Sequence, residues 1–278
     1  MLLNIRIKNA VGNTINMDFR FKEKSSSRMP LLIFCHGFKG FKDWGCFPYM
    51  LDRFAEAGIF TVSFNFSLNG TDNDKPNPVD FEKLDNFARN TFTEELNDLG
   101  CVIDYLEQNR DIYNYDFDKL ILAGHSRGGG LSILKGAEDK RVKKLAVLAS
   151  VADFNRYGDE TRRIWREKGY IEVLNTRTKQ KMRMNVSLLE DLEVNKERLD
   201  IREALEKINI PVLVIHGTED LAVDKGEAEI IYNGLGSKVK SELIILSNTG
   251  HTFGAVHPFA GTTQQLEEVM NRIIEFSK

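Results

Sequence analysis

Cysteine is scarce in this sequence, with three in 278 residues: Cys35, Cys46 and Cys101. Three thiols at wide, irregular spacing exclude a disulfide framework and a zinc knuckle. Long apolar runs are also missing, because no stretch approaches the roughly 20 apolar residues that a membrane-spanning helix needs. Arg6 and Lys8 interrupt the apolar residues at the start of the chain, which does not fit a secretory signal. We therefore expect reduced thiols, a cytoplasmic location and no membrane insertion.

An excess of either charge is missing too. The chain carries 38 basic and 41 acidic residues, which leaves a formal net charge of −3. Proteins that bind nucleic acid usually carry a basic excess or patch, so nucleic acid is not an expected partner. Internal repeats and low-complexity tracts are absent, and 42% of the residues are apolar. These properties exclude a disordered or fibrous chain and indicate a globular one.

The sequence does contain a regular alternation of short apolar runs and amphipathic stretches. Runs that are apolar on both faces indicate buried parallel strands, and the amphipathic stretches between them indicate covering helices. Residues 1–7 and 14–21 flank the turn signal Gly12-Asn13 and predict an antiparallel hairpin at one edge of the sheet. The predicted parallel strands are 31–35, 59–64, 119–124, 143–150, 211–217 and 241–247.

The alternation breaks once, between Ser150 and Pro211. This stretch is densely charged and too long for a single crossover helix, so we predict a small inserted cap at 153–205. Within the cap, residues 170–184 predict a polar hairpin with helices on either side. The predicted fold class is α/β, a mostly parallel central sheet with helices on both faces. The predicted core comprises residues 1–152 and 206–278.

One motif in this framework carries chemistry, the segment Gly124-His125-Ser126-Arg127-Gly128 between a predicted strand and a predicted helix. A serine in such a motif sits on a sharp turn, and the glycines on either side avoid side-chain collisions there. The helix N-terminus that follows offers N–H groups to a developing oxyanion. Chance supplies roughly 0.07 Gly-x-Ser-x-Gly matches in a chain of this composition. We therefore predict that Ser126 is a nucleophile, the alternative being a glycine-rich turn capped by serine.

A serine hydroxyl needs a general base, and the chain has five histidines. His251 is our choice, because it follows the last predicted strand and lies at the same sheet edge as Ser126. A histidine that only bonds backbone in its loop is the alternative for His251, and His257 is the second choice of base. His36 and His216 each precede a glycine at the end of a predicted strand, where shaping a turn is favoured over proton transfer. His125 is expected to point away from its neighbour Ser126.

The acid that orients the base is predicted after strand 211–217. Asp220 is our choice, because the chain order serine, aspartate, histidine is that of enzymes with a serine on this kind of turn. Glu219 and Asp224 are interpreted as solvated or helix-capping, and Asp153 as a less favoured substitute.

Two N–H groups are needed for the oxyanion, and we predict those of Arg127 and Phe38. Phe38 lies in the segment 36–41, His-Gly-Phe-Lys-Gly-Phe, where glycine lets the backbone approach a substrate closely. Aromatic residues of this loop and of the cap are candidates for the substrate pocket, with ordinary core packing as the alternative for each. These candidates are Phe41, Trp44, Trp165 and Tyr170.

Four segments together resemble a known family: HGFKG (36–40), GHSRGG (124–129), HGTED (216–220) and GHTF (250–253). In their order and spacing the chain resembles an α/β-hydrolase-fold serine hydrolase, nearest to the cinnamoyl/feruloyl esterase and dienelactone-hydrolase-like branch. The resemblance implies the α/β-hydrolase fold, ester hydrolysis through an acyl-enzyme, and no metal or organic cofactor. Two positions depart from the branch. Dienelactone hydrolases use cysteine where Ser126 stands, and feruloyl esterases often carry a small or amide residue where Arg127 stands.

The leading hypothesis is therefore a carboxylesterase that acts on a small-molecule ester through a Ser126, His251 and Asp220 triad. A prolyl-oligopeptidase-like peptidase, a thioesterase and an acyltransferase would use the same triad and stay open as alternatives. A non-catalytic ligand-binding protein of the same fold is the alternative from another class. A homodimer is among the assemblies that the sequence allows.

Overall fold

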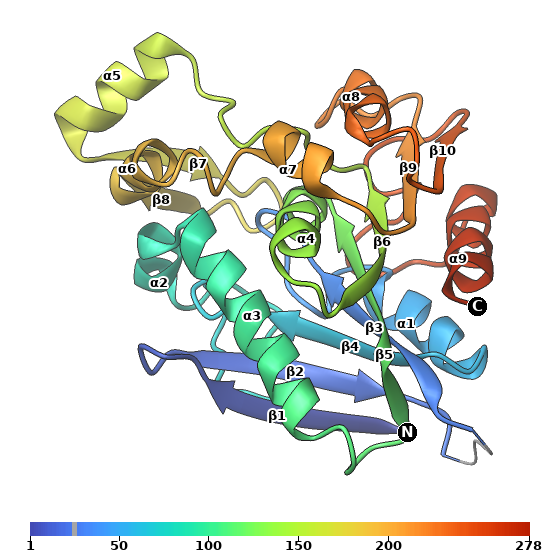
Figure 1. Cartoon of the computed structure of the whole chain (residues 1–278). Coiled ribbons are helices and arrows are strands. Elements are labelled where there is room, and N and C mark those ends of the chain that lie inside the picture. Colours follow the sequence, from blue (N-terminus) through green and yellow to red (C-terminus); the bar gives the residue numbers. More distant parts are fainter. Residues whose placement is uncertain (24–26) are drawn as a thin grey trace.

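The computed structural model describes residues 1–23 and 27–278. Its centre is a single sheet to which eight strands of the described residues contribute (Figure 1). In chain order these strands are β1 (Leu2–Lys8), β2 (Thr14–Arg20), β3 (Met29–Cys35), β4 (Phe60–Asn65), β5 (Tyr115–His125), β6 (Val142–Leu148), β9 (Val212–Gly217) and β10 (Ser241–Leu246).

The order of the strands across the sheet is β1-β2-β4-β3-β5-β6-β9-β10. β1 pairs antiparallel with β2, and β2 antiparallel with β4, whereas every other pairing is parallel. Gly12, with φ of +86°, lies in the turn of the edge hairpin, a conformation that glycine adopts without strain. The predicted fold class and the predicted edge hairpin are both confirmed.

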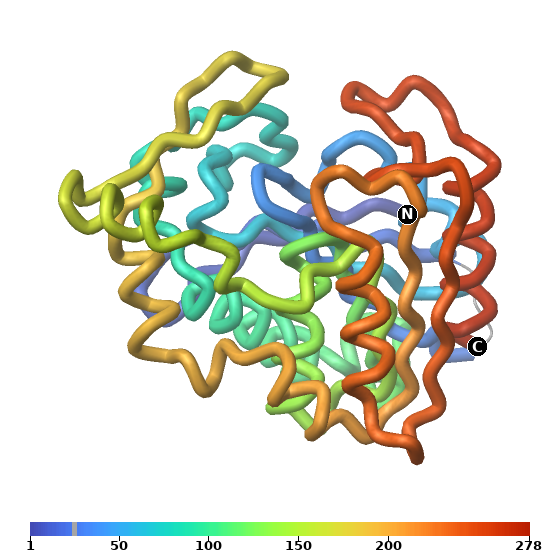
Figure 2. The backbone as a smooth tube through the Cα atoms, turned by 90° about the horizontal axis from the view of Figure 1, so that it is seen from above, coloured from blue at the N-terminus to red at the C-terminus, as the bar shows by residue number. Residues whose placement is uncertain are grey.

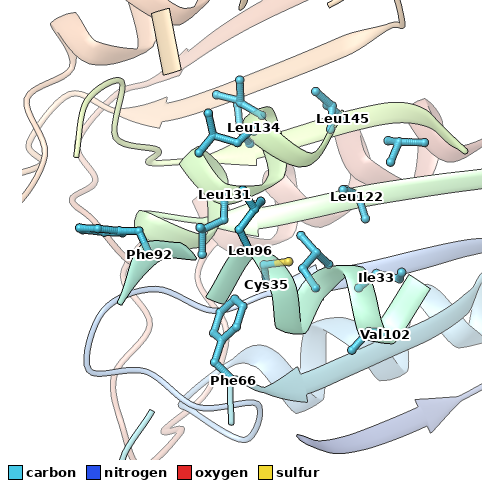
Figure 3. Packing of buried hydrophobic residues seen from close by; sticks show 14 of the residues in the cluster. Ile33, Cys35, Phe66, Phe92, Leu96, Val102, Leu122, Leu131, Leu134 and Leu145 are labelled. Atoms are coloured by element: carbon cyan, nitrogen blue, oxygen red, sulfur yellow. The ribbon is translucent and has the colours of Figure 1, made fainter. Parts of the chain in front are cut away.

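Helices cover both faces of the sheet. Those that pack on it directly are α1 (Phe47–Glu56), α3 (Phe92–Gln108), α4 (Arg127–Glu138), α8 (Gly226–Gly234) and α9 (Gln264–Ser277). Successive residues of a strand point to opposite faces. In β3, Ile33 therefore belongs to the buried cluster that includes Leu96 of α3 and Leu131 of α4 (Figure 3), while Phe34 belongs to the cluster that includes residues of α1 and α9. The apolar runs of the sequence are thus buried on both sides.

The segment between β6 and β9 carries a small second sheet. β7 (Tyr170–Leu174) pairs antiparallel with β8 (Lys181–Asn185), flanked by α5 (Asp159–Lys168) and α6 (Ser187–Val194). Figures 1 and 2 show these elements on the opposite side of the molecule from α9.

The segment contacts the core at both of its ends. β8 lies against α2 (Leu84–Arg89), and the chain returns through α7 (Ile201–Lys207), which packs on α4. Among the described residues, none of the helices combines the length and the apolar character needed to span a bilayer.

Candidate active site

Ser126 lies on the turn between β5 and α4 in a strained backbone conformation. Its φ of 58° and ψ of −121° are rarely adopted by residues other than glycine. The Ser126 N–H donates to the carbonyl of Leu148 in β6 at 2.9 Å, and the Ser126 carbonyl accepts from the N–H of Gly129 at 3.0 Å. The sheet and the first turn of α4 therefore hold the strained residue in place.

The glycines around Ser126 are required by close backbone contacts. A Cβ atom on Gly124 would lie 2.2 Å from the carbonyl oxygen of Gly128, and one on Gly128 would lie 2.3 Å from that of Cys35. A Cβ on Gly37, in the loop after β3, would lie 2.9 Å from Cβ of Ser126. The turn can thus form only if these three positions lack side chains, which is the steric reason expected for the motif.

Asp220 and His251 form a hydrogen-bonded pair next to this turn. His251 lies in the loop after β10, and its Nδ1 is 2.7 Å from Oδ2 of Asp220. The other oxygen of this fully buried carboxylate accepts from the backbone N–H groups of Ala222 and Val223. With Nδ1–H directed at the carboxylate, Nε2 of His251 is the nitrogen left to take a proton.

His216, at the end of β9, shares the same carboxylate oxygen. Its Nε2 lies 3.2 Å from Oδ2 of Asp220 and 3.0 Å from the carbonyl of Val223, so this nitrogen carries the hydrogen. Burial raises the pKa of Asp220, but the hydrogen bonds from His216 and His251 outweigh it and hold the pKa well below its usual range. Asp220 is therefore a carboxylate at neutral pH.

The sequence interpretation gave His216 only a role in shaping a turn, so its contact with Asp220 was missed. The signal for it is the spacing His-Gly-Thr-Glu-Asp, which places a histidine four residues before the acid.

His125 is hydrogen-bonded to the backbone of the loop that carries His251. Its Nε2 lies 2.8 Å from the carbonyl oxygen of His251, and the two ring centroids are 4.6 Å apart. Burial, with the nearby His251, lowers the pKa of His125 to about 3, so the ring is neutral and donates Nε2–H to that carbonyl.

The remaining two histidines are engaged with the backbone. His257 accepts the Gly45 N–H at its Nδ1 over 2.8 Å, and His36 is buried beside Gly37. Neither of these contacts includes Asp220, whereas Nδ1 of His251 is hydrogen-bonded to it.

Ser126 and His251 both line two adjoining cavities. The smaller, of about 290 Å³, lies toward α1 and the loop between β7 and β8. The larger, of about 450 Å³, lies beneath the inserted segment. The smaller is lined by residues that include Gly37, Trp44, Phe47, Asn175, Arg177 and His257. The walls of the larger include Phe92, Arg127, Val151, Phe154, Tyr157 and Met184.

Phe38 and Arg127, the predicted oxyanion donors, line the larger cavity together with Ser126. Arg127 follows Ser126 in the chain, and Phe38 follows Gly37, which approaches the Ser126 side chain closely. Within the described residues, neither backbone N–H donates to a protein acceptor. Both are therefore free to bind an oxygen atom of a ligand.

Of the aromatic residues predicted for the substrate pocket, Trp44 lines one of these cavities, whereas Phe41 and Trp165 line neither. Trp44 lines the smaller cavity. Phe41 has no exposed surface because its ring packs against those of Phe81 and His257. Trp165 is equally buried, and it is the buried residue of α5.

Tyr170 also lies outside both cavities, because its ring is at the start of β7 beneath the Arg183 guanidinium, 4.4 Å from the ring centroid. The aromatic residues that do line the larger cavity, Phe92, Phe154 and Tyr157, were not among the candidates. They come from the start of α3 and from the chain after β6, and no local pattern marks them as cavity residues.

The described residues contain no group of three or more histidine, cysteine, aspartate or glutamate side chains arranged to bind a metal ion.

Comparisons with known proteins agree with this architecture. The BD-FAE family model matches residues 17–235. No curated protein sequence matches the chain. Among solved structures, Est1E from Butyrivibrio proteoclasticus with bound ferulic acid is 18% identical, with a TM-score of 0.72 over 98% of this chain and 97% of that one.

Two further structures cover the whole of this chain. A putative hydrolase from Agrobacterium vitis S4 is 18% identical over its full length, with a TM-score of 0.77. A putative dienelactone hydrolase from Klebsiella pneumoniae is 13% identical over 98% of its length, with a TM-score of 0.62. At these identities the likeness establishes a common fold.

Proposed function

Because the chain belongs to the BD-FAE family, we propose that it hydrolyses carboxylic esters, with Ser126, His251 and Asp220 as its catalytic residues. The family match bears out the resemblance to the esterase and dienelactone-hydrolase-like branch. The observation that carries the proposal is the 2.7 Å bond between Asp220 and His251, at a cavity that His251 shares with a serine on a strained turn.

In the proposed first step, Oγ of Ser126 attacks the ester carbonyl while Nε2 of His251 takes the hydroxyl proton. The Asp220 carboxylate stabilises the imidazolium that forms. The N–H groups of Phe38 and Arg127 donate to the oxyanion of the tetrahedral intermediate. When the intermediate collapses, the bond to the alcohol oxygen breaks and His251 returns the proton to the leaving alcohol.

The second step repeats this chemistry with water. His251 takes a proton from a water molecule, the resulting hydroxide attacks the acyl carbon, and the proton returns to Ser126 as the acid leaves. Acyl transfer to another alcohol or a thiol would differ only in this second nucleophile. A panel of acyl acceptors therefore separates an esterase from an acyltransferase.

The proposal is tested with a fluorophosphonate probe and p-nitrophenyl acetate. We expect the probe to label the protein at Ser126 and Ser126→Ala to abolish both labelling and turnover, because the nucleophile is removed. Ser247→Ala is the matched control, since Ser247 is exposed and outside both cavities. Labelling that persists in Ser126→Ala would overturn the assignment of the nucleophile.

A further inference from the structure

The charged side chains that line the two cavities beside Ser126 are all basic. Lys39 lines both cavities, Arg177 lines the smaller, and Arg127 and Arg156 line the larger. This is a local property, because the whole chain carries a net charge of −3. A hollow lined by charges of one sign concentrates ligands of the opposite sign.

Arg127 follows the reacting serine directly in the chain, and its side chain is packed on several sides. The side chain is about nine-tenths buried, and its Nη1 lies 3.4 Å from Oε1 of Glu95. The guanidinium carbon is 4.2 Å from the ring centroid of Phe38 and 4.7 Å from that of Phe92. Because these contacts already hold the Arg127 side chain, it loses little conformational entropy when it binds an anion.

Glu95 does not use up the hydrogen-bonding capacity of Arg127. Their contact is one long bond, and within the described residues the other guanidinium N–H groups donate to no protein acceptor. Glu95 lines neither cavity, and its Oε1 is shared with the Asn90 amide at 2.6 Å. A planar edge of the guanidinium is therefore available to a ligand, and that edge matches the two oxygens of a carboxylate.

The other two cations of the larger cavity stand nearer to solvent. Arg156 pairs with Glu227 at 3.2 Å, and Lys39 donates to the carbonyl of Leu174 at 3.2 Å. Apart from these cations the walls are mostly apolar or aromatic. The apolar and aromatic members are Phe38, Phe92, Val151, Phe154, Tyr157, Val173, Met184, Ala222 and Val223.

We propose that the larger cavity binds an arm of the ester substrate that is apolar along its length and carries a carboxylate, which pairs with the Arg127 side chain. The inference rests on the proposed ester hydrolysis and adds a substrate class to it. Arg127 thereby has two separate roles, its backbone N–H at the oxyanion and its guanidinium in specificity.

The test compares esters that differ by one charge. Mono-p-nitrophenyl glutarate and p-nitrophenyl pentanoate differ only in a carboxylate that replaces a methyl group on the acyl arm. 4-Carboxyphenyl acetate and 4-methylphenyl acetate make the same exchange on the alcohol arm. In at least one pair we expect the anionic ester to be preferred about tenfold or more in kcat/KM, and the preference to weaken as salt screens the charges.

The variant that tests whether the larger cavity binds the carboxylate is Glu95→Gln/Arg127→Met. It removes both charges and leaves no unpaired buried ion. We expect it to abolish the preference for the anionic ester, mainly through a higher KM for that ester. Arg177→Met is the matched variant in the smaller cavity and should keep the preference. Arg166→Met, on the exposed side of α5, controls for the loss of a positive charge elsewhere.

The outcomes separate the inference from the proposed function. If neutral esters react and the anionic partner of neither pair is preferred, the inference is wrong and the esterase stands. If Arg177→Met rather than the double variant removes the preference, the anion binds in the other cavity and the inference is wrong.

If no ester is hydrolysed, the proposed function is wrong. Calorimetric binding of the same esters to Ser126→Ala then tests the cavity by itself. Preferential binding of the carboxylate partner supports the inference, and equal binding of both partners overturns it.

Discussion

A single carboxylate oxygen, Oδ2 of Asp220, receives hydrogen bonds from two histidines. His251 is partly exposed in the cavity wall, whereas His216 is completely buried and Nδ1 of its ring has no partner among the described residues. In the proposed mechanism, His216 is a positioning residue. It would hold the carboxylate in place from the buried side, much as outer-shell partners orient the ligands of a metal.

Removal of this support should impair the proposed triad without abolishing its activity. In His216→Phe we expect Asp220 to lose one of the bonds that depress its pKa and to orient His251 less strictly. kcat should fall about tenfold, by analogy with the loss of outer-shell partners, while KM stays nearly constant. Steady-state kinetics across pH 5–9 check this, and Asp220→Asn, expected to cost on the order of 10⁴ in kcat, is the reference. An unchanged kcat in His216→Phe would remove His216 from the positioning role.

At the scale of elements, the junction of β5 and α4 leaves no room for side chains at its two glycines. Gly124 and Gly128 let the first turn of the helix touch both its own strand and the end of β3. The same junction presents Ser126 to both cavities. Glycine spacing in the sequence was sufficient to locate it, because the collisions that the glycines avoid involve residues close in the chain or on the neighbouring strand.

Gly128→Ala should destabilise the fold strongly. The new Cβ would lie 2.3 Å from the carbonyl oxygen of Cys35, so β3 and α4 must separate. We expect a loss of about 3 kcal/mol or more in the free energy of unfolding, at the upper end of overpacking costs. Urea denaturation measures it. Gly236→Ala, where the added atom meets nothing within 4 Å, should change stability little, and equal effects of the two substitutions would contradict the steric argument.

Across the whole molecule, a buried polar network joins the edge hairpin to the helical layer. Asn9, after β1, donates to Oδ1 of Asp98 in α3 at 2.8 Å, and the Ser67 N–H donates to the other oxygen at 2.7 Å. Burial raises the pKa of Asp98 to about 7, against the opposing effect of these hydrogen bonds. The protonated acid is therefore favoured in the folded state relative to the unfolded chain.

This raised pKa makes stability depend on pH. The contribution of Asp98 is fully present below its ordinary pKa and is lost as pH rises through about 7. The free energy of unfolding of the wild type, minus that of Asp98→Asn, should fall by on the order of 2 kcal/mol between pH 5 and pH 8. Chemical denaturation of both proteins at the two pH values measures it. A difference that is constant or rises with pH would show that Asp98 stays ionised in the fold.

Local patterns in the chain were enough to predict the order of the sheet strands along the chain, the edge hairpin, the small hairpin at 170–184 and the turn at Ser126. Apolar periodicity and glycine spacing act over a few residues and need no knowledge of the rest of the molecule. They also led to Asp220 and His251, because residues that follow parallel strands gather at one edge of the sheet.

Tertiary packing alone decided what surrounds these residues. Phe92, Arg127 and Tyr157 meet at the larger cavity from separate parts of the chain, while Phe41 and Trp165 are enclosed in the core. His216 acquires its role only through the fold of the loop that brings Asp220 back toward β9. Which side chains face a cavity depends on contacts between segments that are distant in the sequence, and no pattern along the chain contains that information.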